Sequence, residues 1–180
     1  MKSREILKLD WQRLQEVTGQ PASEMTWKSC FSPRFSSVYL IRKAHSFYSR
    51  KMYRLSKLTS LVNFLVFGAE VPARLEIGPG LVLPHPQGII LGASRIGSNA
   101  TIFQQVTLGA KTLDFDFNED ARPVLKDNIV VSAGAKIIGG VMIGSDSIVG
   151  ANAVVNSDVA ANSLAVGVPA TVRPRTSKEK

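Results

Sequence analysis

Residues 125–159 read LKDNIVVSAGAKIIGGVMIGSDSIVGANAVVNSDV, and this stretch repeats with a period of six residues. Aliphatic side chains recur at every sixth position from Leu125 to Val155, and small residues such as Ser132, Gly144 and Gly150 follow several of them. A period of six matches neither the 3.6-residue turn of a helix nor the alternation of an ordinary strand. It is typical of a triangular solenoid, in which each hexapeptide forms one short strand and one corner, with its aliphatic residue inward.

The repeat extends upstream with two irregularities. It runs through Ile77 and Leu83, slips by one residue at Ile89-Ile90, and then continues to Leu108. Residues 111–124 have no such period and carry four acidic side chains, so we expect them to leave the solenoid as an extruded loop. Three hexapeptides make one coil, and the whole pattern therefore predicts a left-handed parallel β-helix of about four coils.

The first 69 residues have a different pattern. One helix is expected before the break at Gly19-Gln20-Pro21, and residues 37–67 form one long helix or two consecutive ones. We therefore divide the chain into three parts. These are an N-terminal helical region (residues 1–69), a β-helix domain (residues 70–174) and a basic tail (residues 175–180).

The helical region is strongly basic. Residues 25–69 contain eight Lys and Arg side chains and no acidic one, which equals the whole formal net charge of +8. The charged side of these helices either faces water or contacts an anionic surface. Phospholipid headgroups and an anionic glycan are both open as partners of residues 34–67, whereas we expect no nucleic-acid partner.

Composition and residue counts exclude several classes of protein. With 44% hydrophobic and 20% charged residues, the chain is an ordinary globular protein and is not disordered. The longest nearly apolar run, residues 58–69, is shorter than the roughly 20 residues of a membrane-spanning helix. The first residues do not resemble a signal peptide, so we expect a cytoplasmic protein, with peripheral contact to the inner membrane face left open.

Metal and disulfide chemistry are also excluded by the counts. Cys30 is the single cysteine, which rules out an internal disulfide and a zinc site built from cysteines. The two histidines, His45 and His85, cannot form a three-histidine zinc site within one chain, so a solenoid carbonic anhydrase is excluded and no metal is expected.

His85 is the best candidate for acid–base chemistry within the repeats. It lies between two prolines immediately before the slip in the period, and such a slip can present a side chain outward. A lone histidine in a repeat is more often structural, but these neighbours favour a functional one. Glu70 lies fifteen residues earlier, close to one coil of eighteen, and can orient the imidazole; Glu76 is the competing candidate.

Four stretches carry a resemblance to a known family. They are Ile77-Gly-Pro-Gly-Leu-Val-Leu-Pro-His-Pro-Gln-Gly-Ile-Ile, Gln105-Val-Thr-Leu-Gly, Ser132-Ala-Gly-Ala-Lys-Ile-Ile-Gly and Val166-Gly-Val-Pro-Ala. With them, residues 70–174 resemble the hexapeptide-repeat acyltransferases, and specifically the serine acetyltransferase family. Arg42-Lys-Ala-His45 is similar to a short stretch in the helices of that family, and we expect His45 to be structural.

The resemblance implies a mechanism and a set of site residues. His85 would be the general base and Glu70 its carboxylate partner, and the acceptor hydroxyl would attack acetyl-CoA directly. The family is trimeric, and it binds coenzyme A in the groove between adjacent solenoids; whether two trimers pair here stays open. The matching contact positions are Ala110, Ala133 and Ile148 for the pantetheine arm, and Lys136, Arg173 or Arg175 for the phosphates.

Departures from the family pattern favour a carbohydrate acceptor. Pro84 replaces an aspartate that helps to hold serine, and Ala121-Arg122-Pro123 replaces an Arg-His-Pro stretch. The helical region is also short. These differences favour an O-acetyltransferase that modifies a capsule, exopolysaccharide or O-antigen sugar, with Arg122 at the acceptor.

Two alternatives remain. One is a serine O-acetyltransferase of cysteine biosynthesis, although the tail ends in Ser177-Lys-Glu-Lys and lacks the terminal isoleucine expected for docking to the next enzyme. The other is a non-catalytic solenoid scaffold, which would neither bind coenzyme A nor respond to a change of His85.

Overall fold

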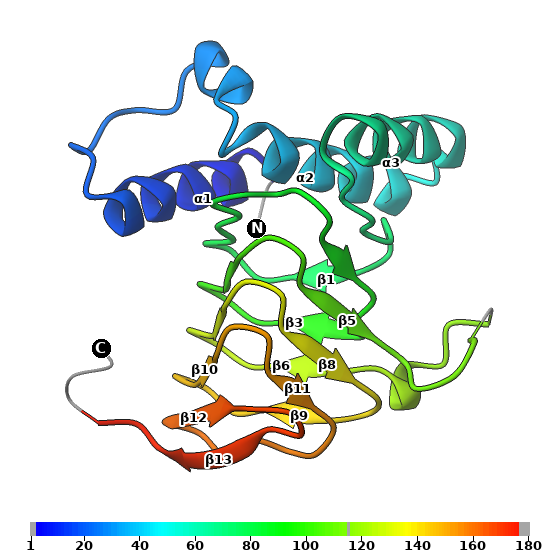
Figure 1. Ribbon diagram of the computed structural model, residues 1–180. Helices are drawn as coiled ribbons and strands as arrows, with labels where there is room; N and C mark the ends of the chain where they lie inside the picture. Colours follow the sequence, from blue (N-terminus) through cyan, green and yellow to red (C-terminus); the bar gives the residue numbers. More distant parts are fainter. Residues whose placement is uncertain (1–2, 115, 177–180) are drawn as a thin grey trace.

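The computed structural model describes residues 3–114 and 116–176, so residues 177–180 of the predicted basic tail lie outside it. Figure 1 shows a solenoid of stacked coils whose N-terminal end is covered by helices. The helical segments at this end are α1 (Ser3–Thr18), η1 (Trp27–Phe31), α2 (Ser36–Ser49) and α3 (Tyr53–Phe67), and one further short 3-10 helix, η2 (Glu119–Ala121), lies in the extruded loop. The predicted fold class, mainly β with an N-terminal helical region, is confirmed.

The helices end where the local sequence predicts. α1 stops at Gly19, whose positive φ of 63° suits glycine. Residues 37–67 form two helices, with the break at residues 50–52, where Lys51 also has a positive φ. α2 buries apolar residues such as Ile41, but α3 buries only Ser56 and Asn63. The apolar residues of α3, such as Leu58, are therefore not part of the buried core.

The strands of the solenoid form three sheets. The first, the β1 sheet, contains β1 (Glu76–Ile77), β3 (Arg95–Ile96), β6 (Val124–Leu125) and β9 (Met142–Ile143). The β2 sheet contains β2 (Ile90–Leu91), β5 (Thr107–Gly109), β8 (Lys136–Ile138) and β11 (Val154–Val155). The β4 sheet contains β4 (Thr101–Ile102), β7 (Val130–Val131), β10 (Ile148–Val149), β12 (Ser163–Val166) and β13 (Thr171–Pro174). All named pairs are parallel except β12 with β13, which is antiparallel.

The hexapeptide period sets which side chains enter the core. The six predicted aliphatic residues from Leu125 to Val155 are each at most 1% exposed. Each pairs with the residue eighteen positions away in the next coil: Leu125 with Ile143, Val131 with Val149, and Ile137 with Val155. The interior is therefore a stack of aliphatic layers, as predicted.

One corner of the solenoid is built from residues with left-handed backbones. Asn99, Asn128 and Asp146 have left-handed backbones with φ of 58°, 59° and 61°. Their side chains form a ladder, with hydrogen bonds of 3.0 Å from Asn99 to Asn128 and from Asn128 to Asp146. Gly144 has no positive φ; a Cβ atom there would collide with the backbone of Ala161 in the next coil. The small residues thus allow the coils to stack closely, and the asparagine ladder turns the corner.

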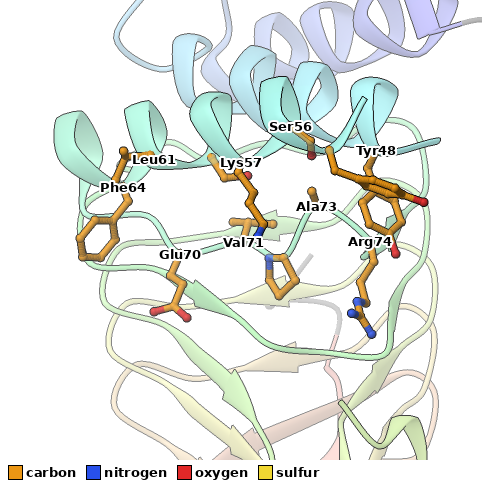
Figure 2. A pocket seen from close by; sticks show the side chains of 12 residues that line it. Tyr48, Ser56, Lys57, Leu61, Phe64, Glu70, Val71, Ala73 and Arg74 are labelled. Carbon is orange, nitrogen blue, oxygen red and sulfur yellow. The ribbon is translucent and has the colours of Figure 1, made fainter. Parts of the chain in front are cut away.

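α3 lies over the first residues of the solenoid, and a cavity of about 770 Å³ separates the two. Figure 2 shows Tyr48 at the end of α2 and Lys57, Leu61 and Phe64 of α3 on one side of this cavity, with residues 70–74 on the other. Glu70 is an exposed member of this lining.

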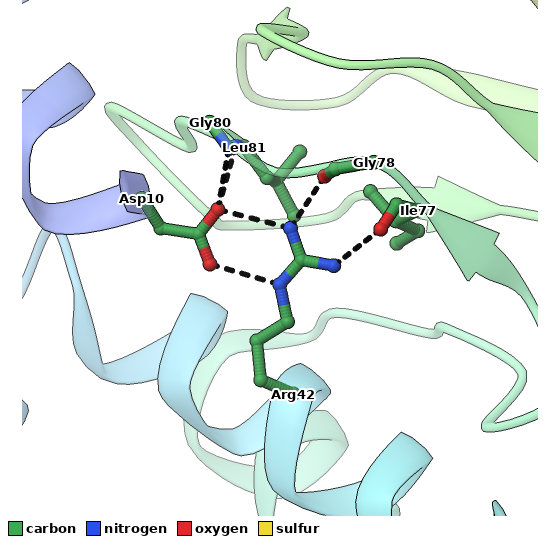
Figure 3. Close-up of polar contacts among 6 residues, drawn as sticks. All are labelled: Asp10, Arg42, Ile77, Gly78, Gly80 and Leu81. Atoms are coloured by element: carbon green, nitrogen blue, oxygen red, sulfur yellow. Dashed lines mark hydrogen bonds and ion pairs between the residues drawn. The ribbon is translucent and has the colours of Figure 1, made fainter. Parts of the chain in front are cut away.

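A buried ion pair fastens the helices to the solenoid (Figure 3). The Nε and Nη2 atoms of Arg42 in α2 donate to the carboxylate of Asp10 in α1, at 2.8 and 2.9 Å. The same guanidinium donates to the carbonyl oxygens of Ile77 and Gly78, both at 2.6 Å. Asp10 in turn accepts hydrogen bonds from the backbone of Gly80 and Leu81. Two helices and the first coil thus share one hydrogen-bonded network.

Candidate functional site

His85 lies at an enlarged corner of the first coil. Seven residues, 84–90, separate the inward Leu83 from the inward Leu91, whereas five separate the aligned Ile102 from Leu108. The extra residues let the corner bulge, with Pro86 buried and the side chain of His85 exposed. The slip in the period therefore has the predicted effect of presenting the histidine outward.

A cavity of about 460 Å³ surrounds His85. The corner contributes residues 84–87, and the helical region contributes Gln20, which follows α1, and residues 32–34, which lie between η1 and α2. Within the described chain, neither the imidazole of His85 nor the guanidinium of Arg34 forms a hydrogen bond or an ion pair. A base and a cation therefore share one open cavity, and both are available to a ligand.

Sequence reasoning missed Gln20 and Arg34 as residues of this site. They lie about fifty or more positions before His85, in loops without a recognisable motif. Only the packing of the helical region on the first coil brings them to the histidine. The lack of any acidic residue near Arg34 in the sequence is the one signal that could have drawn attention to it.

The predicted His85–Glu70 pair is not hydrogen bonded within the described residues. The backbone of Glu70 forms an isolated parallel bridge with Ile90, five residues after His85, so Glu70 lies one coil before the strand that follows the His85 corner. The carboxylate is exposed, and it lines the cavity under α3 and not the cavity at His85. The pairing stays a prediction.

The predicted coenzyme A positions lie on two sheets of the solenoid. Ala110 directly follows β5 and Lys136 lies in β8, both of the β2 sheet, while Ile148 and Arg173 lie in the β4 sheet. Ala133 is at the corner between these sheets, one coil of the repeat after Gln104. None of the five lines the cavity at His85.

Lys136 has the chemistry expected for a phosphate contact. Its ammonium group donates to the carbonyl oxygens of Gln105 and Gly134, at 2.6 and 3.0 Å. Since an ammonium group has three N–H donors, one remains for an anionic ligand. The residue thus fits a coenzyme A phosphate without losing its contacts to the solenoid.

Arg122 is bound within the extruded loop and is not in the cavity at His85. Its guanidinium donates to the carboxylate of Asp114 at 2.9 Å and to the carbonyl oxygen of Gly92 at 3.0 Å, and it lies 3.9 Å from the ring centre of Phe117. The backbone N–H of Asn118 and the Arg122 guanidinium hold the pKa of Asp114 below its ordinary value. The pair is a clasp that closes the loop on itself.

His45 and Cys30 have structural surroundings. Nδ1 of His45 donates to the carbonyl oxygen of Ala73 at 3.0 Å, which fixes its tautomer and ties α2 to the start of the solenoid. Burial raises the pKa of the Cys30 thiol, which keeps it protonated at neutral pH. Neither residue lines the cavity at His85.

Comparison with known proteins identifies the family. The chain is 32% identical to a serine acetyltransferase of Helicobacter pylori over 167 residues, which are 92% of this chain and 96% of that protein. The chain belongs to the serine acetyltransferase family. It is accordingly an acyltransferase that uses acetyl-CoA.

Other relatives agree with this membership. A serine acetyltransferase of Bacillus subtilis is 34% identical over 144 residues, 79% of this chain and 65% of that protein. The crystal structure of the Neisseria gonorrhoeae serine acetyltransferase superposes with a TM-score of 0.84 at 27% identity, over 96% of this chain and 66% of that one. No family model matches the chain.

The expected carbohydrate acceptor is wrong. The relatives that match most of the chain, the helical region included, are named serine acetyltransferases and not polysaccharide acetyltransferases. The short helical region is no departure either, since the match spans 96% of the Helicobacter protein. Residues 84 and 122 differ from the family pattern, but these two differences do not indicate a different acceptor class.

One observation concerns whether a helix of this protein could span a membrane. Within residues 3–114 and 116–176, no helix combines the length and the apolar character that a bilayer crossing needs.

Proposed function

We propose that the protein transfers the acetyl group of acetyl-CoA to the hydroxyl of L-serine, as a serine O-acetyltransferase of cysteine biosynthesis. The observation that carries this proposal is the open cavity that His85 shares with Arg34. It offers a base for the hydroxyl and a cation for the carboxylate of a small amino acid. The names of the family members support the same acceptor.

His85 acts as the general base in this proposal. Its neutral imidazole accepts the proton of the serine hydroxyl as the serine oxygen attacks the thioester carbonyl carbon. The new C–O bond forms and the C–S bond breaks. The imidazolium then returns the proton to the departing sulfur, so the products are O-acetylserine and coenzyme A.

Arg34 and Gln20 hold the acceptor. A guanidinium binds a carboxylate through charge-assisted hydrogen bonds, and it does so with a preferred orientation. The amide oxygen of Gln20 accepts a hydrogen bond from the ammonium group, a role that Pro84 cannot perform. We assign the carboxylate to Arg34 and not to Arg122, because the guanidinium of Arg122 is bound to Asp114.

Glu70 orients His85 in this proposal, since it lies one coil before Ile90, the strand residue that follows the His85 corner, and a carboxylate stabilises an imidazolium. The contact forms in the complex with substrates, because catalytic hydrogen bonds tighten there. The coenzyme A positions lie on both sides of one corner, which suits a groove where two solenoids meet. We therefore propose a homotrimer, in which Lys136 and Arg173 bind phosphates and Ala110, Ala133 and Ile148 contact the pantetheine arm.

Thiol release from acetyl-CoA tests the acceptor. We expect turnover with L-serine, and none with L-alanine, which lacks the hydroxyl. Arg34→Gln should raise KM for serine by about ten-fold or more, the equivalent of one charge-assisted hydrogen bond, and leave KM for acetyl-CoA unchanged. The control is Arg95→Gln, an exposed arginine of β3 outside the His85 cavity. Absence of serine-dependent thiol release would refute the proposed function.

A further inference from the structure

The polar face of α3 is buried and its apolar face is exposed, which is the reverse of a typical surface helix in a water-soluble domain. Its buried side chains are Ser56 and Asn63, whereas Leu58 is 56% exposed and Leu65 is 71% exposed. A surface helix normally turns its apolar stripe towards the core. The exposed apolar residues of α3 are therefore not explained by the packing of the chain.

The inward face is small and polar because α3 lies close to its neighbours. Ser56 Oγ donates to the carbonyl oxygen of Ala44 in α2 at 2.9 Å. Asn63 Nδ2 donates to the carbonyl oxygen of Ala69 at 3.4 Å, just beyond the end of the helix. The packing of α3 thus depends on its polar residues and leaves its apolar residues exposed.

The exposed apolar residues fall into two groups. Leu61 and Phe64 line the cavity between α3 and the first coil (Figure 2). A second group, here called the outer stripe, does not line that cavity and is spaced at three, four and three residues, as on one side of a helix. It consists of Leu55, Leu58, Val62 and Leu65, with Val66 beside them.

Positive charge accompanies the outer stripe. Arg50, Lys51 and Arg54 are exposed at the N-terminal end of α3, and Arg54 directly precedes the first leucine of the stripe. No acidic residue occurs between residues 25 and 69. An apolar stripe with a purely basic margin is complementary to an anionic lipid surface. The stripe fits the acyl region, and the basic residues fit the anionic headgroups.

We propose that α3 binds an anionic membrane surface through the outer stripe, Arg50, Lys51 and Arg54. The helix lies along the interface, since its 15 residues are too few to span a bilayer. A second copy of the chain fits less well. Two α3 helices packed in parallel would bring their basic ends together, and packed antiparallel they would offer those ends no acidic partner. This proposal does not depend on the acceptor.

Co-sedimentation of the full chain with vesicles tests the proposal. We expect binding to phosphatidylcholine vesicles that contain phosphatidylglycerol, weaker binding at high salt, and little binding to phosphatidylcholine alone. The double change Leu58→Gln and Leu65→Gln should lower the affinity by about ten-fold or more, since it removes two exposed leucines from the stripe. The matched control is Leu113→Gln, an 87% exposed leucine of the extruded loop.

A double substitution of basic residues tests the charged part of the surface separately from the outer stripe. Arg50→Gln with Arg54→Gln should abolish the preference for anionic vesicles, whereas Arg95→Gln with Lys126→Gln, two exposed basic residues of the solenoid, should keep it. Circular dichroism checks that each variant is folded. Failure of the unchanged protein to bind anionic vesicles would overturn the proposal. A smaller assembly of the leucine variant in sedimentation velocity would overturn it in favour of a second copy.

Discussion

At the scale of single residues, the chemistry depends on how His85 is presented. The prolines on either side and the two extra residues of the corner expose the ring, while the leucines before and after it stay in the core. The helical region then contributes Arg34 to the open cavity at His85. In the proposed mechanism the base is therefore held by a solenoid corner, and the cation that binds the acceptor comes from another part of the chain.

His85→Ala should lower kcat by about a thousand-fold, the usual contribution of a general base. The affinity for acetyl-CoA should stay within about two-fold, since the proposed coenzyme A positions lie outside the His85 cavity. Thiol release and equilibrium binding of acetyl-CoA measure the two effects. A variant that keeps full turnover would remove His85 from the mechanism.

Part of the site could be predicted from the sequence, and the reason is local. His85 stands out because prolines, a glycine and a break in the period surround it within eight residues. Arg34 and Gln20 have no such surroundings, and their contact with the corner depends on the Asp10–Arg42 network, which joins residues 32 positions apart. A pattern within one element is visible in the sequence, whereas a contact between elements is not.

At the scale of elements, the extruded loop is the part whose conformation depends most on one ion pair. Asp114 and Arg122 are eight residues apart, and each side chain is 11% exposed. The loop has no hexapeptide period to hold it, so its order comes from this clasp and from Phe117. The sequence predicts that residues 111–124 leave the solenoid, because they lack its period. It does not predict the ion pair that closes the loop, because a single ion pair produces no repeating pattern.

Asp114→Asn should raise the hydrogen-exchange rate of loop amides several-fold at neutral pH, because the clasp loses its charge. In the unchanged protein, the lowered pKa of Asp114 means that the clasp stabilises the loop above the ordinary aspartate range. That stabilisation is lost only as the pH falls through the lowered pKa. Exchange measured by mass spectrometry between neutral and strongly acidic pH should show this step, and the Asn variant should lack it. Equal loop protection in both proteins at neutral pH would contradict the clasp.

α3 shows the limit of reasoning from helical periodicity. Leu55 and Leu58 belong to an apolar stripe in the sequence, and such a stripe is normally buried. In the structure they are 42% and 56% exposed, and the serine and asparagine of the same helix are buried. Periodicity identifies a face but not the direction in which it points, because that depends on the neighbouring helix.

At the scale of the whole molecule, the helical region and the solenoid share one buried ion pair and a continuous core. Leu7, Phe35 and Ile41 from the helices belong to the same hydrophobic cluster as the solenoid interior. Arg42 and Asp10 complete their hydrogen bonds with the first coil. The two parts should therefore unfold together.

Asp10→Ala should destabilise the protein by about 3–5 kcal/mol, because it leaves the Arg42 charge buried without a partner. Urea unfolding followed by circular dichroism should show one shifted transition. The control is Glu16→Gln, which breaks the exposed Arg13–Glu16 pair and should change stability by less than about 1 kcal/mol. Separate transitions for helices and strands would show that the network does not couple them.

The antiparallel strand β13 ends the solenoid in a way that limits growth. Every other named pair in the stack is parallel, so the last coil would otherwise present edges shaped to accept another coil. β13 pairs with β12 in the reverse direction, and the backbone of Gly167 and Ala170 bonds to Val154 in the last strand of the β2 sheet. This antiparallel strand thereby caps the end of the solenoid. The same repeat that builds a rigid wall for catalysis would, without those last residues, offer the end of each molecule as a seed for a fibre.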